Sequence, residues 1–273
     1  MRIFSPPDNL DEHILRSYSV LRWFMVGFGL ALPVLLVVGG INSWWWLKDA
    51  LPVQDSLSAY YHAGHSCIPL QGVYRDLFVG LLAAIGFCLI IYTGFGKLEN
   101  WLLNIAGFSL LGVAYFPTDW PNPAALASCR LVPGFQPYHA SRLLGLPVSV
   151  HVVSAIVFFA AITLVNGLTA LDTVEIIADP GERQFWRNVF RVMRFIMPVS
   201  LGVVLLFLRG DQRLVLWLEW VGIWAFSFYW LLKSIEILGT KLDVDISNGN
   251  FEWVGAGWGR RLSRKTTNSQ TKP

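Results

Sequence analysis

Long, uninterrupted runs of apolar residues alternate with short polar segments along the chain. A helix needs about 20 residues to cross the hydrocarbon core of a bilayer. The runs are continuous, and they lack the strict alternation typical of strands in an outer-membrane barrel. The pattern therefore predicts six membrane-spanning helices, which cover about residues 19–41, 75–95, 101–117, 146–168, 192–208 and 214–236.

Spans of this kind predict an all-α, polytopic membrane protein, because a helix satisfies its own backbone hydrogen bonds within lipid. Residues 1–18 form an N-terminal arm, residues 19–236 the six-helix transmembrane domain, and residues 237–273 a basic tail. The arm does not resemble a cleaved signal, so we expect the first apolar run to stay in the mature protein. We expect the end of the tail, "GRRLSRKTTNSQTKP", to be disordered and to rest near anionic lipid.

Composition supports this class. Hydrophobic residues make up 54% of the chain and charged residues 14%, whereas charged residues reach about 25% in soluble proteins. The 13 tryptophans suit a protein with two membrane interfaces. A net charge of +3 is too small to indicate a nucleic-acid partner, and the bilayer is the expected partner.

The distribution of positive charge predicts the orientation. Roughly fifteen Lys and Arg residues lie near the span ends on the side that holds both termini, against about six on the opposite side. The bias places the N- and C-termini in the cytoplasm, so we expect a multi-pass protein of the plasma membrane. The loops of about 42–74 and 118–145 then lie outside. Each holds one cysteine, Cys67 and Cys129, and an oxidising exterior permits a disulfide between them.

Several ionisable residues share one depth near the external face. Asp76, His151, Glu219 and Asp119 all fall within roughly 10 Å of that interface at a rise of about 1.5 Å per residue, and His62 approaches from the same side. Ionisable groups at membrane depth indicate functional sites. Each also has a structural interpretation: Asp76 pairing with Arg75 or capping its helix, His151 bonding a carbonyl, and Glu219 joining two helices.

The external edge carries residues suited to contacts with headgroups or with a partner protein. "WWW" at positions 44–46 is typical of an interfacial belt. Arg75 and Arg142 supply positive charge on the same side.

The polar layer offers the ligands of a zinc site. His62, His151 and a carboxylate, Asp76 or Glu219, make three ligands with an open fourth position. Zinc held in this way lowers the pKa of a bound water to about 7 and generates hydroxide for hydrolysis.

Two resemblances follow from particular residues. "YYHAG", "RDLFVG", "GVAYFPTD", "HVVSAIVFF" and "LEWVGIWAF" look like a family of uncharacterised six-helix bacterial membrane proteins, over about residues 56–236. Against that family, the chain carries apparent insertions, "HSCIPLQGVY" and a stretch containing "ASCRLVPGFQPYHASR". Each insertion holds one of the two cysteines, which supports the disulfide.

The second resemblance is more distant. Ser58-x-x-x-His62 followed by Asp76 is similar to the signature of the alkaline ceramidase and adiponectin-receptor superfamily of intramembrane zinc hydrolases. The resemblance implies that His62 ligates zinc, and that Ser58 and Asp76 position the reacting water or stabilise the oxyanion. The chain lacks the seventh helix and the late HxxxH of that superfamily, so His151 would replace the missing pair, with Glu219 as a further catalytic candidate.

Other functions stay open. The protein is a zinc-dependent lipid hydrolase, or a non-enzymatic protein that binds a lipid or serves a membrane complex as an accessory subunit. A transporter with Glu219 and His151 as a proton relay is a third hypothesis, although no inverted repeat is visible. A haem protein with His62 and His151 as axial ligands is a fourth.

Overall fold

The computed structural model describes residues 10–41, 53–62, 72–119, 140–146, 148–242, 245 and 250–265, with side chains from residue 15 onward. Cys67, Cys129 and the three tryptophans at 44–46 lie outside the described residues. The predicted disulfide and the predicted aromatic belt at 44–46 therefore stay predictions.

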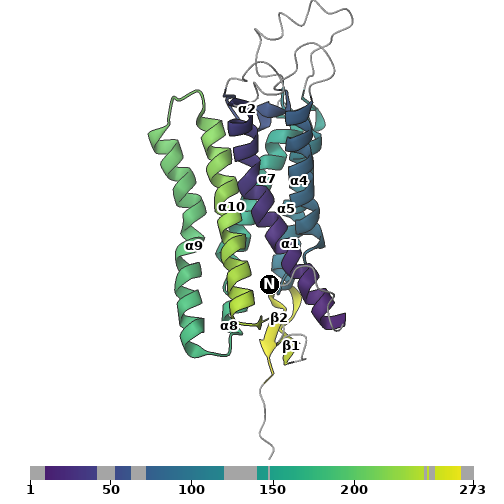
Figure 1. The fold of residues 1–273 in the computed structure, drawn as a ribbon, viewed down its shortest axis with the longest axis vertical. Coiled ribbons are helices and arrows are strands. Elements are labelled where there is room, and N and C mark those ends of the chain that lie inside the picture. Colours follow the sequence, from purple (N-terminus) through teal and green to yellow (C-terminus); the bar gives the residue numbers. More distant parts are fainter. Residues whose placement is uncertain are drawn as a thin grey trace, which may run out of the picture.

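The described chain is mostly helical, which confirms the all-α class (Figure 1). The main helices are α1 (Leu10–Pro33), α4 (Val73–Ile91), α5 (Lys97–Tyr115), α7 (Val150–Leu164), α9 (Pro180–Phe207) and α10 (Leu214–Gly239). Shorter elements extend them: α1 continues through a π-helical turn (Val34–Val38) into α2 (Gly39–Ile41), and α7 continues through a second π-helical turn (Val165–Thr169) to α8 (Asp172–Glu175).

Local chemistry explains where several of these helices begin and change. Ser149 accepts a hydrogen bond from the Val152 N–H and so caps α7. At the start of α9, the Asp179 side chain accepts a hydrogen bond from the Glu182 N–H and so caps the helix, and Pro180 occupies the first helical position. The π-helical turn after α1 follows Pro33, which has no N–H to donate to the helix.

Within the described residues, five stretches are long and apolar enough to cross a membrane: Leu15–Ile41, Val73–Ile91, Val150–Glu175, Pro180–Phe207 and Leu214–Gly239. They correspond to the first, second, fourth, fifth and sixth predicted spans. The third predicted span overlaps α5, a helix of 19 residues that begins with Lys97, ends at Tyr115 and has Glu99 in its first turn. The membrane-length helices are thus present, and the count of six stays a prediction.

The helices pack side by side in the order α9, α10, α1, α4, α5, α7. α9 lies at one edge, where it packs mainly on α10 and touches α7 only slightly (Figure 1). We call the end at which α7 and α10 begin the upper end and the opposite one the lower end, as they are drawn.

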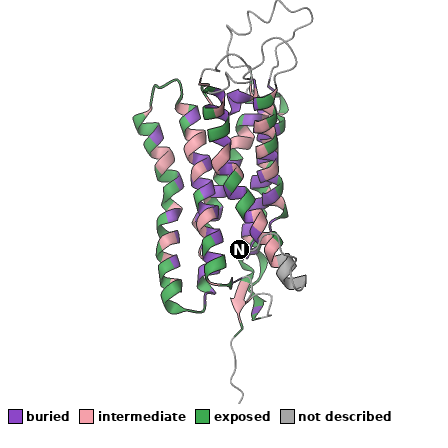
Figure 2. Cartoon of the chain, viewed as in Figure 1, coloured by how far each residue is buried: buried purple, intermediate pink, exposed green. Residues whose placement is uncertain are grey.

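Exposed residues run along the outer faces of the helices (Figure 2), and many of them are large and apolar, as a bundle in lipid requires. On α9, Phe195 is 60% exposed, Leu206 78% and Phe207 83%. A soluble monomer rarely exposes so large an apolar surface, so these side chains are suited to face lipid.

The start of the basic tail is not disordered, which corrects that expectation. Strands β1 (Phe251–Val254) and β2 (Arg261–Arg264) form an antiparallel hairpin at the lower end (Figure 1). The Lys97 N–H donates to the Arg260 carbonyl at 3.0 Å, and the Leu262 N–H donates to the Phe95 carbonyl at 3.3 Å. The hairpin is therefore fixed to the turn that precedes α5.

A glycine contact between α4 and α5 provides a test of this packing. A Cβ on Gly107 would lie 2.7 Å from the Gly86 carbonyl oxygen and 2.6 Å from Ile90 Cγ1. We expect Gly107→Ala to lower the free energy of unfolding by about 1–3 kcal/mol through overpacking. Gly80→Ala is the matched control, because no atom lies within 4 Å of its added Cβ. Thermal unfolding in detergent should separate the two variants, and equal midpoints would contradict this packing.

Candidate functional site

A groove of about 610 Å3 lies at the upper end, between α7, α9, α10 and the segment 55–59. Its existence follows from the slight contact between α7 and α9. The groove has one polar end and one apolar end. Polar lining residues are Asp55, Ser56, Ser58, Thr118, His151, Gln212 and Glu219; apolar ones include Val152, Ile156, Phe159, Leu201, Leu205, Val215 and Leu218. Phe159 and Leu201 lie more than a helical turn deeper along their helices than the polar group.

Glu219 attaches the segment 53–62 to α10. Its Oε2 accepts the Leu57 N–H at 2.6 Å. The Leu216 N–H, one of the free donors at the start of α10, donates to the Asp55 carbonyl at 3.0 Å. Glu219 therefore joins the segment to the bundle while its half-buried side chain still lines the groove.

The same segment packs inward through aromatic residues. A short 3-10 helix, Ser58–Tyr61, follows the turn at Ser56, whose Oγ accepts the Ala59 N–H at 3.0 Å. Tyr60 is completely buried and lies 6.2 Å, centroid to centroid, from Tyr74 on α4. Burial raises the pKa of Tyr60 above its ordinary value, so this hydroxyl stays neutral.

Two histidines hold the upper end of α5. His151 Nδ1 lies 3.1 Å from the Val113 carbonyl oxygen and 3.0 Å from the Phe116 carbonyl oxygen. Both oxygens can only accept, so Nδ1 carries the proton and Nε2 of the neutral ring keeps its lone pair. His62 Nε2 donates to the Thr118 carbonyl at 2.8 Å by the same reasoning.

The structure brings together some of the residues that the sequence singled out. Ser58, His151 and Glu219 line the groove, and His62 is joined to it through Thr118. Asp76 is not among the lining residues.

The charged residues of the predicted external edge form exposed ion pairs. Asp76 is 70% exposed and lies 3.1 Å from Arg75 Nε, and Arg142 Nη2 lies 3.3 Å from Asp119 Oδ2. Among the described residues, no three His, Cys, Asp or Glu side chains gather as a metal site requires. Zinc ligation by His62, His151 and Asp76 stays a prediction.

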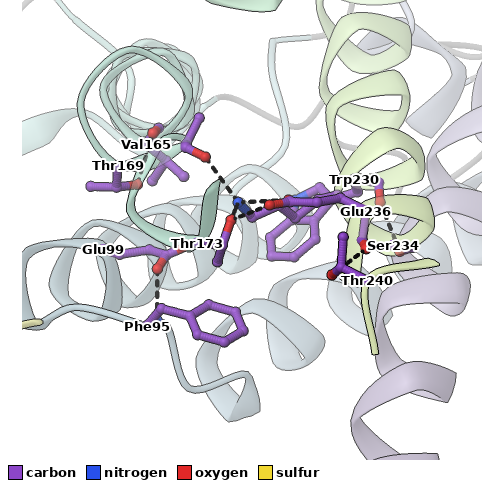
Figure 3. Close-up of polar contacts among 11 residues, drawn as sticks. Phe95, Glu99, Val165, Thr169, Thr173, Trp230, Ser234, Glu236 and Thr240 are labelled. Atoms are coloured by element: carbon purple, nitrogen blue, oxygen red, sulfur yellow. Dashed lines mark hydrogen bonds and ion pairs between the residues drawn. The ribbon is translucent and has the colours of Figure 1, made fainter. Parts of the chain in front are cut away.

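A second polar cluster lies towards the lower end, and the sequence did not single it out (Figure 3). Lys233 Nζ lies 3.2 Å from Glu236 Oε2, and both side chains are at most 1% exposed. The Thr173 hydroxyl donates to Glu236 Oε1 at 2.6 Å, and Lys233 also donates to Thr173 and to the Ala170 carbonyl. Close by, Glu99 is buried and accepts the Phe95 N–H at 2.7 Å.

Sequence offered weak signals for this cluster. Lys233 and Glu236 lie three residues apart on one helix, a spacing that places them on one face. From sequence alone, Lys233 is one of the positive charges near the span ends, and Glu99 lies just before the third predicted span. Their partners Thr173 and Phe95 are distant in sequence, so only the fold shows that they are buried and paired.

No family model matches the chain, and no curated protein or solved structure matches it either. The two resemblances described above therefore stay predictions, and the function is argued from the site alone.

The lower cluster allows a direct test of its role in stability. Lys233→Met should destabilise the protein by about 3–5 kcal/mol, because Glu236 would be left as an unpaired buried charge. Adding Glu236→Gln should recover part of that loss. Arg187→Met, which breaks the exposed pair with Glu175, should cost about 1 kcal/mol or less. Unfolding in detergent measures all three, and equal effects of the two single variants would contradict the cluster.

Proposed function

We propose that this protein is a membrane protein that binds an amphiphile of the bilayer in the groove between α7, α9 and α10. The observation that carries the proposal is the groove itself. It has an apolar part suited to an acyl chain and a polar end formed by Ser58, His151 and Glu219. Its volume of about 610 Å3 falls within the range of roughly 300–1,000 Å3 typical of ligand sites.

The polar end indicates the class of headgroup. Two carboxylates, Asp55 and Glu219, line it, and no Lys or Arg is among the lining residues of the described chain. His151 Nε2 adds a further acceptor in the neutral ring. The groove therefore suits a headgroup that donates hydrogen bonds, an ammonium or a set of hydroxyls, and disfavours an anionic one.

The proposed topology has six spans in a bacterial inner membrane, with both termini in the cytoplasm. α5 supplies the third span in addition to the five other membrane-length helices, since the Glu99 carboxylate accepts the Phe95 N–H inside the bundle and does not face lipid. The positive charges near the lower end support the orientation. In this orientation the polar end of the groove lies in the external leaflet.

A zinc-dependent lipid hydrolase is the second candidate function. It is favoured by the gathering of Ser58, His151 and Glu219 around one groove, and by the lone pair that neutral His151 keeps on Nε2. The same bound amphiphile would then be the substrate. Metal analysis decides between the two: the hydrolase requires stoichiometric zinc that disappears in His151→Ala, whereas binding alone requires none.

Two neighbouring leucines on α9 provide a matched test of the groove. Leu205 lines it, whereas Leu206 is 78% exposed and does not. We expect Leu205→Trp to fill the apolar part and weaken binding of a fluorescent phospholipid by about tenfold or more, with Leu206→Trp close to wild type. Titration of the protein in detergent measures this. Equal affinities of the two variants would place the lipid elsewhere.

The same titration tests the headgroup. Glu219→Gln keeps the shape of the side chain and removes its charge, so binding of an ethanolamine lipid should weaken by about tenfold through loss of a charge-assisted hydrogen bond. A choline lipid has no N–H donor and should bind almost unchanged. Glu252→Gln, an exposed change on the hairpin, is the control. An unchanged ethanolamine affinity in Glu219→Gln would overturn this role of Glu219.

A further inference from the structure

A second pocket lies at the lower end, between the 93–97 turn, the start of α5 and the hairpin. Its volume is about 280 Å3. Its polar lining comes from Thr93, Lys97, Asn100 and Arg260, and Trp253 closes one side. The pocket thus combines two cations with a hydroxyl and an amide, all groups that can donate to an oxyanion.

No carboxylate of the described residues pairs with either of the two cations. Lys97 Nζ lies 5.7 Å from the centre of the Trp258 ring, and the Arg260 guanidinium lies 5.5 Å from that of Trp253. Within the described part of the chain, neither residue forms an ion pair. By contrast, the neighbouring Arg261 lies 3.7 Å from Asp172.

Glu99, which carries the carboxylate in the first turn of α5, points away from the pocket. Glu99 is 1% exposed and accepts the Phe95 N–H inside the bundle. The pocket is therefore positively charged, and its indole rings hold the cations without cancelling their charge.

The position of the pocket indicates the source of its ligand. The hairpin adjoins the ends of the membrane-length helices (Figure 1). Trp253 is 49% exposed and Trp258 59%, and Trp258 packs edge to face on Trp101 of α5. Exposed tryptophans beside cations are typical of the headgroup level of a bilayer.

We propose that this pocket binds the phosphate group of an anionic phospholipid in the leaflet at the lower end of the bundle. The Arg260 guanidinium can take two phosphate oxygens at once, Lys97 adds a point charge, and the Thr93 hydroxyl and the Asn100 amide supply further donors in the same pocket. The site is independent of the upper groove, which has the opposite charge.

Native mass spectrometry of the full-length protein in detergent tests the site with added phosphatidylglycerol. Each positive charge near a membrane surface is worth about a fivefold change in affinity. We therefore expect Lys97→Gln with Arg260→Gln to weaken binding by about 20-fold. The control is Lys241→Gln with Arg191→Gln, two exposed cations outside the pocket, which should bind nearly as wild type does. Arg260 bonds the Lys97 N–H through its backbone carbonyl, so the side-chain substitutions of the pocket variant should keep the hairpin in place. An unchanged melting temperature of the variant checks this.

Two outcomes would overturn the proposal. The first is equal loss of phosphatidylglycerol in the pocket and control variants, because the effect would then reflect net charge alone. The second is displacement of the lipid by equal concentrations of inorganic phosphate, which would assign the pocket to a soluble phosphate compound. Retention of the lipid against inorganic phosphate supports the phospholipid.

Discussion

Every charged side chain inside an apolar helical bundle has to find its partner within the bundle, because lipid supplies none. This constraint matters most for α10, which carries charged residues near both of its ends. Glu219 near its start bonds the backbone of the segment 53–62, and Glu236 near its end pairs with Lys233 and Thr173. The two glutamates are about 25 Å apart along the helix at 1.5 Å per residue. One helix therefore organises a polar layer at each end of the bundle.

The two layers have different consequences because their surroundings differ. The lower layer is closed: its side chains come from α5, α8 and α10, they are at most 1% exposed, and those of α8 and α10 contact each other. The upper layer opens sideways, because α9 packs on α10 and hardly on α7. Polar groups that serve only stability would be expected to be closed off, as in the lower layer. The open upper layer is thus the place where a molecule from the bilayer can reach polar side chains.

Much of the fold could be predicted from the apolar runs, since their length and continuity lead directly to membrane-length helices. Two structural interpretations of single residues were also right: His151 bonds carbonyls, and Asp76 pairs with Arg75. The common depth of His151 and Glu219 is consistent with the groove, which both residues line. Depth does not determine which side of a helix faces the bundle core, however. The exposed position of Asp76 depends on how α4 is rotated about its own axis.

Other features depend on contacts between distant parts of the chain, which no local pattern shows. The hairpin needs Gly255, whose φ of +91° favours glycine and whose Cβ would lie 2.7 Å from the Gly259 carbonyl oxygen. Sequence alone predicts a disordered tail for its basic residues, because the partner at Phe95 lies far away in sequence. The groove was not predictable either, since it arises from how little α9 packs on α7.

Photo-cross-linking with a phospholipid that carries a diazirine on its acyl chain tests the central claim most directly. After irradiation of the protein in bilayers, mass spectrometry maps the labelled residues. The account predicts adducts concentrated on groove residues such as Ile156 and Leu201, with far fewer on Val192, which is 65% exposed on the same helix as Leu201 but outside the groove. Labelling spread evenly over all lipid-facing side chains would contradict a binding groove.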